Sequence, residues 1–185
     1  MLYYLHGYQS KPESKKGTLF RNRLGAIPIE YHEGPPERLD IDQALQQIER
    51  VIGDDPGPIL IGSSLGGFLA AEAALRVKAI KPIVLLNPAI IPPSAELTKL
   101  SGIPNAILKR MQSSPLFETK INVAIVILVG THDELVPLDW VLSFARGQEA
   151  TVKFLDDDHA FTEKLSILPG LIDGILSSIS RRPTC

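Results

Sequence analysis

Short runs of apolar residues recur along the chain with few polar interruptions. Six of these runs have the length of a β-strand: residues 2–5, 26–29, 58–61, 83–86, 123–129 and 152–155. Continuous apolar runs are typical of strands buried on both faces, as in a parallel sheet covered by helices. The pattern therefore predicts about six parallel strands.

The segments between these runs have the length and period of helices. In residues 39–52, seven apolar side chains fall on one helical stripe, and Gly53 follows as a stop signal. Four further segments fit a helix, the last two less clearly: 64–77, 160–179, 15–25 and 138–146. Because strands and helices alternate, we expect a single-domain, three-layer α/β fold over residues 1–185, with helices on both faces of the sheet.

Residues 87–121 interrupt this alternation. The segment contains five prolines around a small apolar patch formed by Ile103, Ile107, Leu108 and Met111. Long connections in compact domains are usually functional or flexible. We interpret 87–121 as an insertion or cap over the strand ends, whose apolar patch either covers an acyl chain or belongs to the core.

The motif Gly62-Ser63-Ser64-Leu65-Gly66 lies between the third predicted strand and an alanine-rich predicted helix. This is the G-x-S-x-G pattern in the strand–turn–helix context of a nucleophile elbow, where a strained turn exposes the serine hydroxyl. The start of the helix also favours developing negative charge. Ser64 is therefore the candidate nucleophile; the alternative is a glycine turn with an incidental serine.

A serine nucleophile needs a base, and the base needs an orienting carboxylate. His159 follows the last predicted strand and Asp133 follows the fifth, so both lie at the sheet edge where Ser64 is expected. The order Ser64, Asp133, His159 is that of the α/β-hydrolases. Other groups remain open: Glu134 adjoins Asp133, and His132 is expected to be a surface neighbour. The aspartates at 156–158 are expected to form a solvated loop, although Asp157 or Asp158 could orient His159.

Acyl transfer also needs two N–H groups to bind the oxyanion. Leu65, the residue after the nucleophile, supplies the first. The loop Leu5-His6-Gly7-Tyr8 after the first strand suggests the second, from Tyr8 with Gly7 as the alternative. His6 either shapes this loop by hydrogen bonding or simply ends a buried strand.

Composition narrows the class of partner. Lysine and arginine number 19 and aspartate and glutamate 21, so the net charge of −2 does not favour nucleic acid or an anionic membrane. No apolar stretch approaches the ~20 residues of a membrane helix. The sole cysteine, Cys185, allows no internal disulfide or cysteine zinc cluster. We expect a cytoplasmic protein without metal or cofactor, because the amino terminus also lacks a basic leader.

Taken together, the motifs resemble those of the α/β-hydrolase superfamily and, more narrowly, of the small bacterial YqiA-like esterases. The resemblance rests on residues 3–10, 61–68, 87–89, 130–137 and 158–161. It implies hydrolysis of carboxylic esters or thioesters of small molecules, with Ser64, Asp133 and His159 as the catalytic triad. Related loops often carry glycine before the catalytic histidine, whereas Asp157 and Asp158 precede it here.

Two other functions are compatible with parts of the sequence. One is a noncatalytic hydrolase-like receptor or interaction protein, which an intact triad disfavours. The other is a nucleotide-binding module, for which Ser64 stands where a dinucleotide motif requires glycine. The triad itself does not separate esterase, thioesterase, lipase and peptidase action.

Overall fold

The computed structural model describes residues 1–99 and 102–181 of the chain, so Cys185 lies outside the described residues. Its centre is a sheet of six parallel strands in the order β2-β1-β3-β4-β5-β6. The strands are β1 (Leu2–Leu5), β2 (Ile27–Pro28), β3 (Ile59–Ser63), β4 (Ile83–Leu86), β5 (Ile125–His132) and β6 (Thr151–Asp158). The prediction of about six parallel strands is confirmed.

Helices follow the strands in alternation. They are α1 (Lys15–Leu24), α2 (Ile41–Ile52), α3 (Leu65–Arg76), α4 (Asn105–Gln112), α5 (Leu138–Gln148) and α6 (Leu168–Ser180). Short 3₁₀ turns cover Pro36–Arg38, Leu97–Lys99, Pro115–Phe117 and Leu165–Ile167. A continuous helix over 160–179 was the wrong prediction, because Phe161 has a φ of 55° and cannot continue a right-handed helix.

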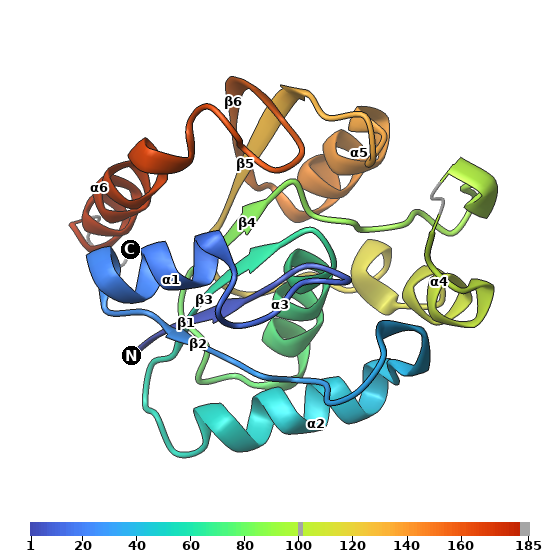
Figure 1. Cartoon of the computed structure of the whole chain (residues 1–185), viewed down its shortest axis with the longest axis horizontal. Coiled ribbons are helices and arrows are strands. Elements are labelled where there is room, and N and C mark those ends of the chain that lie inside the picture. The colour runs from blue at the N-terminus through green and yellow to red at the C-terminus, as the bar shows by residue number, and fades with distance from the viewer. Residues whose placement is uncertain (100–101, 182–185) are drawn as a thin grey trace.

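The sheet separates two cores, which makes the fold three-layered (Figure 1). Successive strand residues point to opposite faces, so Tyr3 packs toward α2, α3 and α5, whereas Tyr4 packs toward α1 and α6. Figure 1 shows α1 and α6 together on one side of the sheet. The predicted α/β architecture with helices on both faces is therefore confirmed.

The edge of the sheet at β6 departs from the prediction of strands buried on both faces. Most residues of β6 are exposed or half-buried, and Phe154 retains 51% of its surface. The reason is that β6 is the last strand in the sheet order and has a neighbour on one side only. Val51 is likewise exposed, although it was predicted on the buried stripe of α2.

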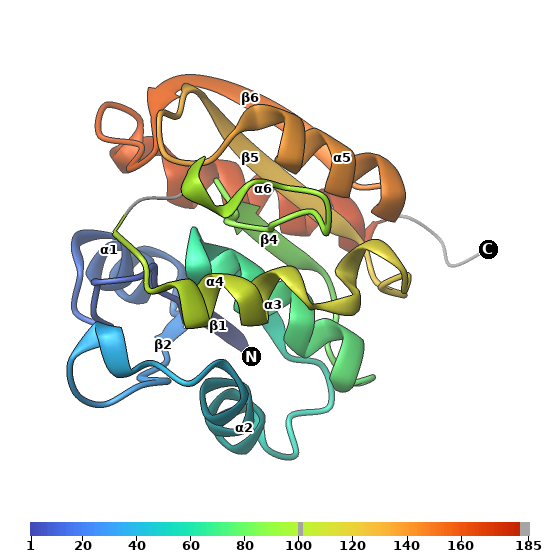
Figure 2. The same ribbon diagram turned by 90° about the vertical axis from the view of Figure 1, so that its right-hand side faces the viewer.

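The segment 87–121 contains α4, which packs beside α3 and next to α2 (Figure 2). Ile107, Leu108 and Met111 are buried in the larger core. The Arg110 guanidinium also bonds the carboxylates of Asp42 on α2 and Glu72 on α3, each through an N–O distance of 2.7 Å. These contacts attach α4 to the body of the domain.

Within the part of the chain that the structure describes, no helix combines the length and apolar character needed to cross a membrane.

Candidate active site

Ser64 lies in a tight turn between β3 and α3. Its φ of 54° and ψ of −118° are a strained conformation for a residue with a side chain. The turn is so close that a Cβ on Gly62 would overlap the Gly66 carbonyl, and a Cβ on Gly66 would overlap the carbonyls of Leu5 and His6. The two motif glycines therefore allow the turn to pack against β1.

His159 and Asp133 meet at the same edge of the sheet. The distance from His159 Nδ1 to Asp133 Oδ2 is 2.8 Å, and the Asp133 side chain is only 6% exposed. The other oxygen of Asp133 accepts the backbone N–H groups of Leu135 and Val136. Asp133 is thus held in place by its own loop while it orients the His159 ring.

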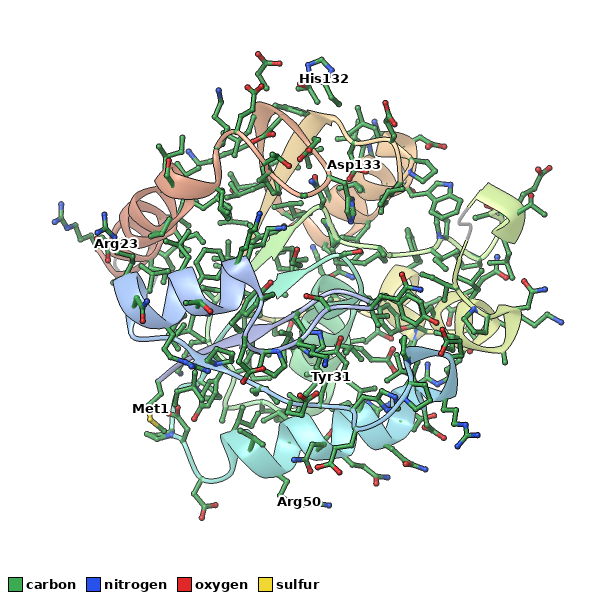
Figure 3. The ribbon with its side chains drawn as sticks, viewed as in Figure 1. Met1, Arg23, Tyr31, Arg50, His132 and Asp133 are labelled. Atoms are coloured by element: carbon green, nitrogen blue, oxygen red, sulfur yellow. The ribbon has the colours of Figure 1, made fainter. Side chains whose placement is uncertain are left out.

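The neighbouring candidates do not take these positions. His132 points out of the molecule, whereas Asp133 points inward (Figure 3). The His132 ring pairs with the exposed Asp156 carboxylate at 2.7 Å. Glu134 is exposed at the rim of the pocket and forms no hydrogen bond with His159. The structure therefore selects Asp133 rather than Glu134 as the partner of His159.

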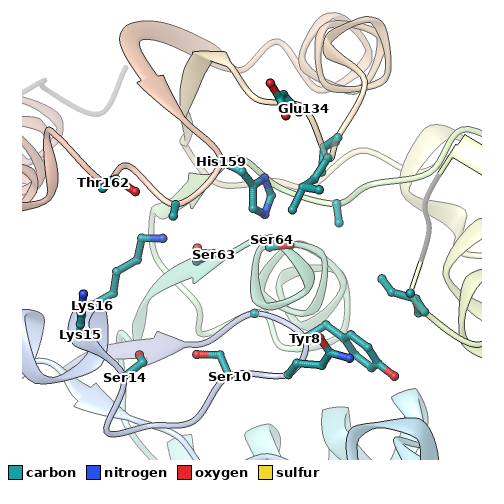
Figure 4. Close-up of a pocket in the computed structure, with 18 of the residues that line it drawn as sticks. Tyr8, Ser10, Ser14, Lys15, Lys16, Ser63, Ser64, Glu134, His159 and Thr162 are labelled. Carbon is teal, nitrogen blue, oxygen red and sulfur yellow. The ribbon is translucent and has the colours of Figure 1, made fainter.

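Ser64 and His159 line one pocket of about 480 Å³ at the carboxyl ends of the strands. Figure 4 shows the His159 ring above Ser64 in this pocket. No hydrogen bond joins the two side chains, both of which the structure describes; such bonds are often long in a protein without substrate and shorten in the complex. The pocket therefore brings Ser64 and His159 together, and Asp133 joins them as a candidate triad through its bond to His159.

Two backbone N–H groups beside Ser64 are free to bind an oxyanion. Among the described residues, neither Leu65 N nor Tyr8 N donates a hydrogen bond. Leu65 opens α3, and Tyr8 lies in the loop after β1, which passes so close that a Cβ on Gly7 would lie 3.3 Å from Ser64 Cβ. The loop is therefore near enough to contribute the second donor.

His6 shapes this loop from beneath. Its Nδ1 lies 2.9 Å from the Gly7 carbonyl oxygen, and its ring stacks on Tyr31 at a centroid distance of 4.3 Å. The Tyr31 hydroxyl donates to the His6 carbonyl at 2.9 Å. Burial lowers the pKa of His6, which favours the neutral ring. These contacts fit the interpretation of His6 as a residue that holds the loop.

Asn87 is a site residue that the sequence reasoning did not identify. It directly follows β4 with a φ of 43°, and its amide links three segments. Asn87 Oδ1 accepts from Gly130 N at 2.8 Å, while Nδ2 donates to the carbonyls of Asp158 and His159 at 3.2 and 3.0 Å. The sequence did offer one signal for this residue: an asparagine directly follows the predicted strand 83–86, which is the next strand after the G-x-S-x-G motif.

The acidic loop before His159 is not wholly solvated, contrary to expectation. Asp157 is 4% exposed and accepts the backbone N–H groups of Asp158, Glu163 and Lys164. Asp158 bonds the backbone and hydroxyl of Thr162, and these bonds lower the pKa of Asp158. Neither carboxylate bonds the His159 ring; instead, both stabilise the loop that carries it.

Strained backbone is concentrated around this pocket. Five described residues other than glycine have a positive φ, and four of them lie in the connections after β1, β3, β4 and β6: Gln9, Ser64, Asn87 and Phe161. Clusters of such residues are typical of functional sites. Among residues 1–99 and 102–181, no three histidine, cysteine or acidic side chains are grouped as metal ligands.

The sequence matches one protein family over nearly its whole length. The model of an uncharacterised protein family (UPF0227) matches residues 1–173, which include every residue of the candidate site.

Solved structures share the fold across nearly the whole chain. Est1E from Butyrivibrio proteoclasticus with ferulic acid bound has a TM-score of 0.81 at 18% identity, over 98% of this chain and 90% of that one. Mouse alpha/beta hydrolase domain-containing protein 10 has a TM-score of 0.78 at 18% identity, over 96% and 89%. A monoacylglycerol lipase from Paleococcus ferrophilus has a TM-score of 0.71 at 17% identity, over 96% and 93%.

Proposed function

Since the chain belongs to the UPF0227 family and has the α/β-hydrolase fold, we propose that it is a serine hydrolase that cleaves carboxylic esters or acyl thioesters of small molecules. The observation that carries the proposal is the shared pocket of Ser64 and His159, with His159 bonded to a buried Asp133 at 2.8 Å. We further propose that the enzyme acts in the cytoplasm without a cofactor.

In the proposed reaction, His159 Nε2 takes the proton of Ser64 Oγ while Oγ attacks the substrate carbonyl carbon. The Asp133 carboxylate accepts the bond from Nδ1–H and stabilises the imidazolium that forms. The negative charge on the carbonyl oxygen is bound by the N–H groups of Leu65 and Tyr8. His159 then protonates the departing alkoxide or thiolate, which leaves an acyl group on Ser64.

The second half of the reaction uses the same groups. A water molecule enters after the alcohol or thiol departs, and His159 removes its proton as it attacks the acyl carbon. Collapse of the second tetrahedral intermediate returns the proton to Ser64 and releases the carboxylic acid. No group is oxidised or reduced, and the net change is hydrolysis of one ester bond.

The first test is labelling with a fluorophosphonate followed by intact-mass measurement. We expect one adduct on the wild-type protein and none on Ser64→Ala or His159→Ala. Ser10→Ala is the matched control, because Ser10 lines the same pocket and is expected to keep the adduct. Loss of Ser64 or His159 should also lower kcat for nitrophenyl esters by about 10⁴-fold or more.

A second pair of variants tests the carboxylate. Asp133→Asn should lower kcat by about 10³-fold or more, because the His159 ring loses the partner that fixes its tautomer, whereas Glu134→Gln should stay within about threefold. A wild-type protein without an adduct or ester turnover would contradict the proposal and favour a noncatalytic receptor. An adduct that persists in Ser64→Ala would exclude Ser64 as the nucleophile.

A further inference from the structure

Lys16 is a cationic side chain in the wall of the candidate active-site pocket. It belongs to the first turn of α1 and lines the same cavity as Ser64 and His159. Figure 4 shows its amine directed toward the side of the pocket near Ser63 and Thr162, whereas Tyr8 lies on the other side. The proposed ester hydrolysis gives Lys16 no role, so its presence there needs an explanation.

The Lys16 ammonium lacks a direct partner in the part of the chain that the structure describes. It forms no ion pair or hydrogen bond there and lies over the Phe161 ring, 5.7 Å from the ring centroid. The nearby acidic groups are Asp158, Asp157 and Asp133. Each of these already accepts hydrogen bonds from other groups, through Thr162, Lys164 N and His159 respectively. Three N–H donors of Lys16 thus remain available to a ligand.

The surroundings of this amine are partly desolvated and contain acidic groups. Burial lowers the pKa of Lys16, and the negative charges of Asp158, Asp157 and Asp133 oppose that shift. A partly desolvated ammonium without a hydrogen-bond acceptor is costly, and an anionic ligand would relieve that cost through charge-assisted bonds. Because three carboxylates lie nearby, a singly charged carboxylate is a better ligand than a phosphate dianion, which they would repel more strongly.

One part of the pocket wall has a different character. Ala89, Ile103, Leu135 and Val136 line it with apolar side chains. The cavity therefore offers an apolar region for a hydrocarbon part and a cationic region for an acid. A volume of about 480 Å³ is within the range of small-molecule sites.

We infer that Lys16 is a specificity-determining residue that binds a carboxylate on the ester or thioester attacked by Ser64. The substrate class is thus an ester that carries a free acid in either its acyl part or its leaving group. This inference rests on the proposed serine hydrolase activity and adds to it the chemistry that selects the substrate.

Two matched pairs of esters test the inference. The acyl pair is the 4-nitrophenyl monoester of glutaric acid and its primary-amide analogue, which has similar shape but no charge. The leaving-group pair is the butyrate ester of 3-hydroxybenzoic acid and that of 3-hydroxybenzamide. We expect wild type to prefer the acid of one pair by about tenfold or more in kcat/KM. The pair that shows the preference identifies the part of the substrate that contacts Lys16.

The variants separate binding of the acid from general damage. Lys16→Met should lower kcat/KM for the preferred acid by about 10- to 100-fold, mainly through KM, and change the amide by less than about threefold. Lys16→Arg should retain part of the preference. Lys11→Met is the matched control, because Lys11 is an exposed lysine in the preceding loop that does not line the pocket.

The contrary outcomes are distinct. Equal losses for acid and amide in Lys16→Met, or no preference for either acid in wild type, would overturn the role of Lys16 while the hydrolase proposal stands. Absence of both a fluorophosphonate adduct and turnover of all four esters would overturn the hydrolase proposal and the inference with it.

Discussion

Asn87 joins the ends of three strands through a single amide. Its oxygen accepts from Gly130 within β5, and its nitrogen donates to the carbonyls of Asp158 and His159 at the end of β6. The side chain bonds the backbone of His159 but none of the side chains of the candidate triad. It thereby fixes the loop that carries the His159 ring near Ser64. A shift of about 1 Å in such a loop can lower the reaction rate by about 10²-fold.

We predict that Asn87→Ala lowers both the free energy of unfolding and kcat. The variant leaves the buried Gly130 N–H without an acceptor, which should reduce the free energy of unfolding by about 1–3 kcal/mol. The loosened His159 loop should lower kcat by about 10- to 100-fold. Urea unfolding and nitrophenyl ester kinetics measure the two effects. Asn105→Ala, at an exposed position on α4, is expected to change neither, and an unchanged kcat in Asn87→Ala would refute the positioning role.

The residues of the candidate site differ in how well they could be predicted from the sequence. Ser64, Asp133 and His159 were proposed because each follows a predicted strand within a recognisable motif; Ser64 and His159 line one pocket, and Asp133 bonds His159. Asn87 and Lys16 were not identified, because their significance lies in what they face across the fold. An asparagine after a strand and a lysine in a helical first turn are common features of surface loops, so sequence alone could not distinguish them.

At the scale of elements, the β3–α3 turn is a tightly constrained connection. Gly66 packs against the carbonyls of Leu5 and His6, so a larger residue would push β3 and α3 away from β1. Most other glycines are not constrained in this way. Gly174, for example, is exposed in α6 with open space where a Cβ would be.

This contrast gives a matched pair of glycine variants. We predict that Gly66→Ala lowers the free energy of unfolding by about 3 kcal/mol or more and abolishes fluorophosphonate labelling, because the overlap involves backbone atoms. Gly174→Ala should raise the free energy of unfolding by about 0.5–1 kcal/mol, because alanine favours helix. Thermal and urea unfolding measure both. A Gly66→Ala protein with normal stability would show that the elbow can relax.

The strands and helices differ in how well the sequence predicted them. Central strands were predicted nearly to the residue, since burial on both faces makes their sequences continuously apolar. The prediction of a helix from residue 160 was wrong, because Phe161 lies in a left-handed turn and its side chain packs in the core beneath α1. The spacing of apolar residues indicates which side chains are buried, and a buried turn can have the same spacing as the first turn of a helix.

At the scale of the whole molecule, the candidate site depends on the sheet itself. Its residues come from loops after β1, β3, β4, β5 and β6, which are distributed over most of the chain. Only the parallel order of the strands brings these loops to one edge. The fold class was predictable because strand and helix patterns alternate, whereas the strand order was not, since apolar runs do not show which strands are neighbours.

We predict that the domain and its site unfold together. Trp140, the single tryptophan, is buried in α5 just after the Asp133 loop, so its fluorescence reports packing near the site. Tryptophan fluorescence, far-UV circular dichroism and fluorophosphonate reactivity should lose half their signal at the same urea concentration. Loss of reactivity at clearly lower urea would instead indicate that the site loops open locally before the domain unfolds.

The strained residues around the pocket have a consequence for the adaptation of this protein to heat. Gln9, Ser64, Asn87 and Phe161 all keep a backbone conformation that side chains disfavour, and all four lie in connections that follow strands of the sheet. Replacements that relieve this strain should raise heat resistance, but in the proposed hydrolase they would also displace the loops that carry Ser64 and His159. Laboratory evolution for survival at high temperature alone would accumulate replacements at these four positions and reduce turnover. Selection that also requires turnover would instead favour replacements at surface positions such as Gly174.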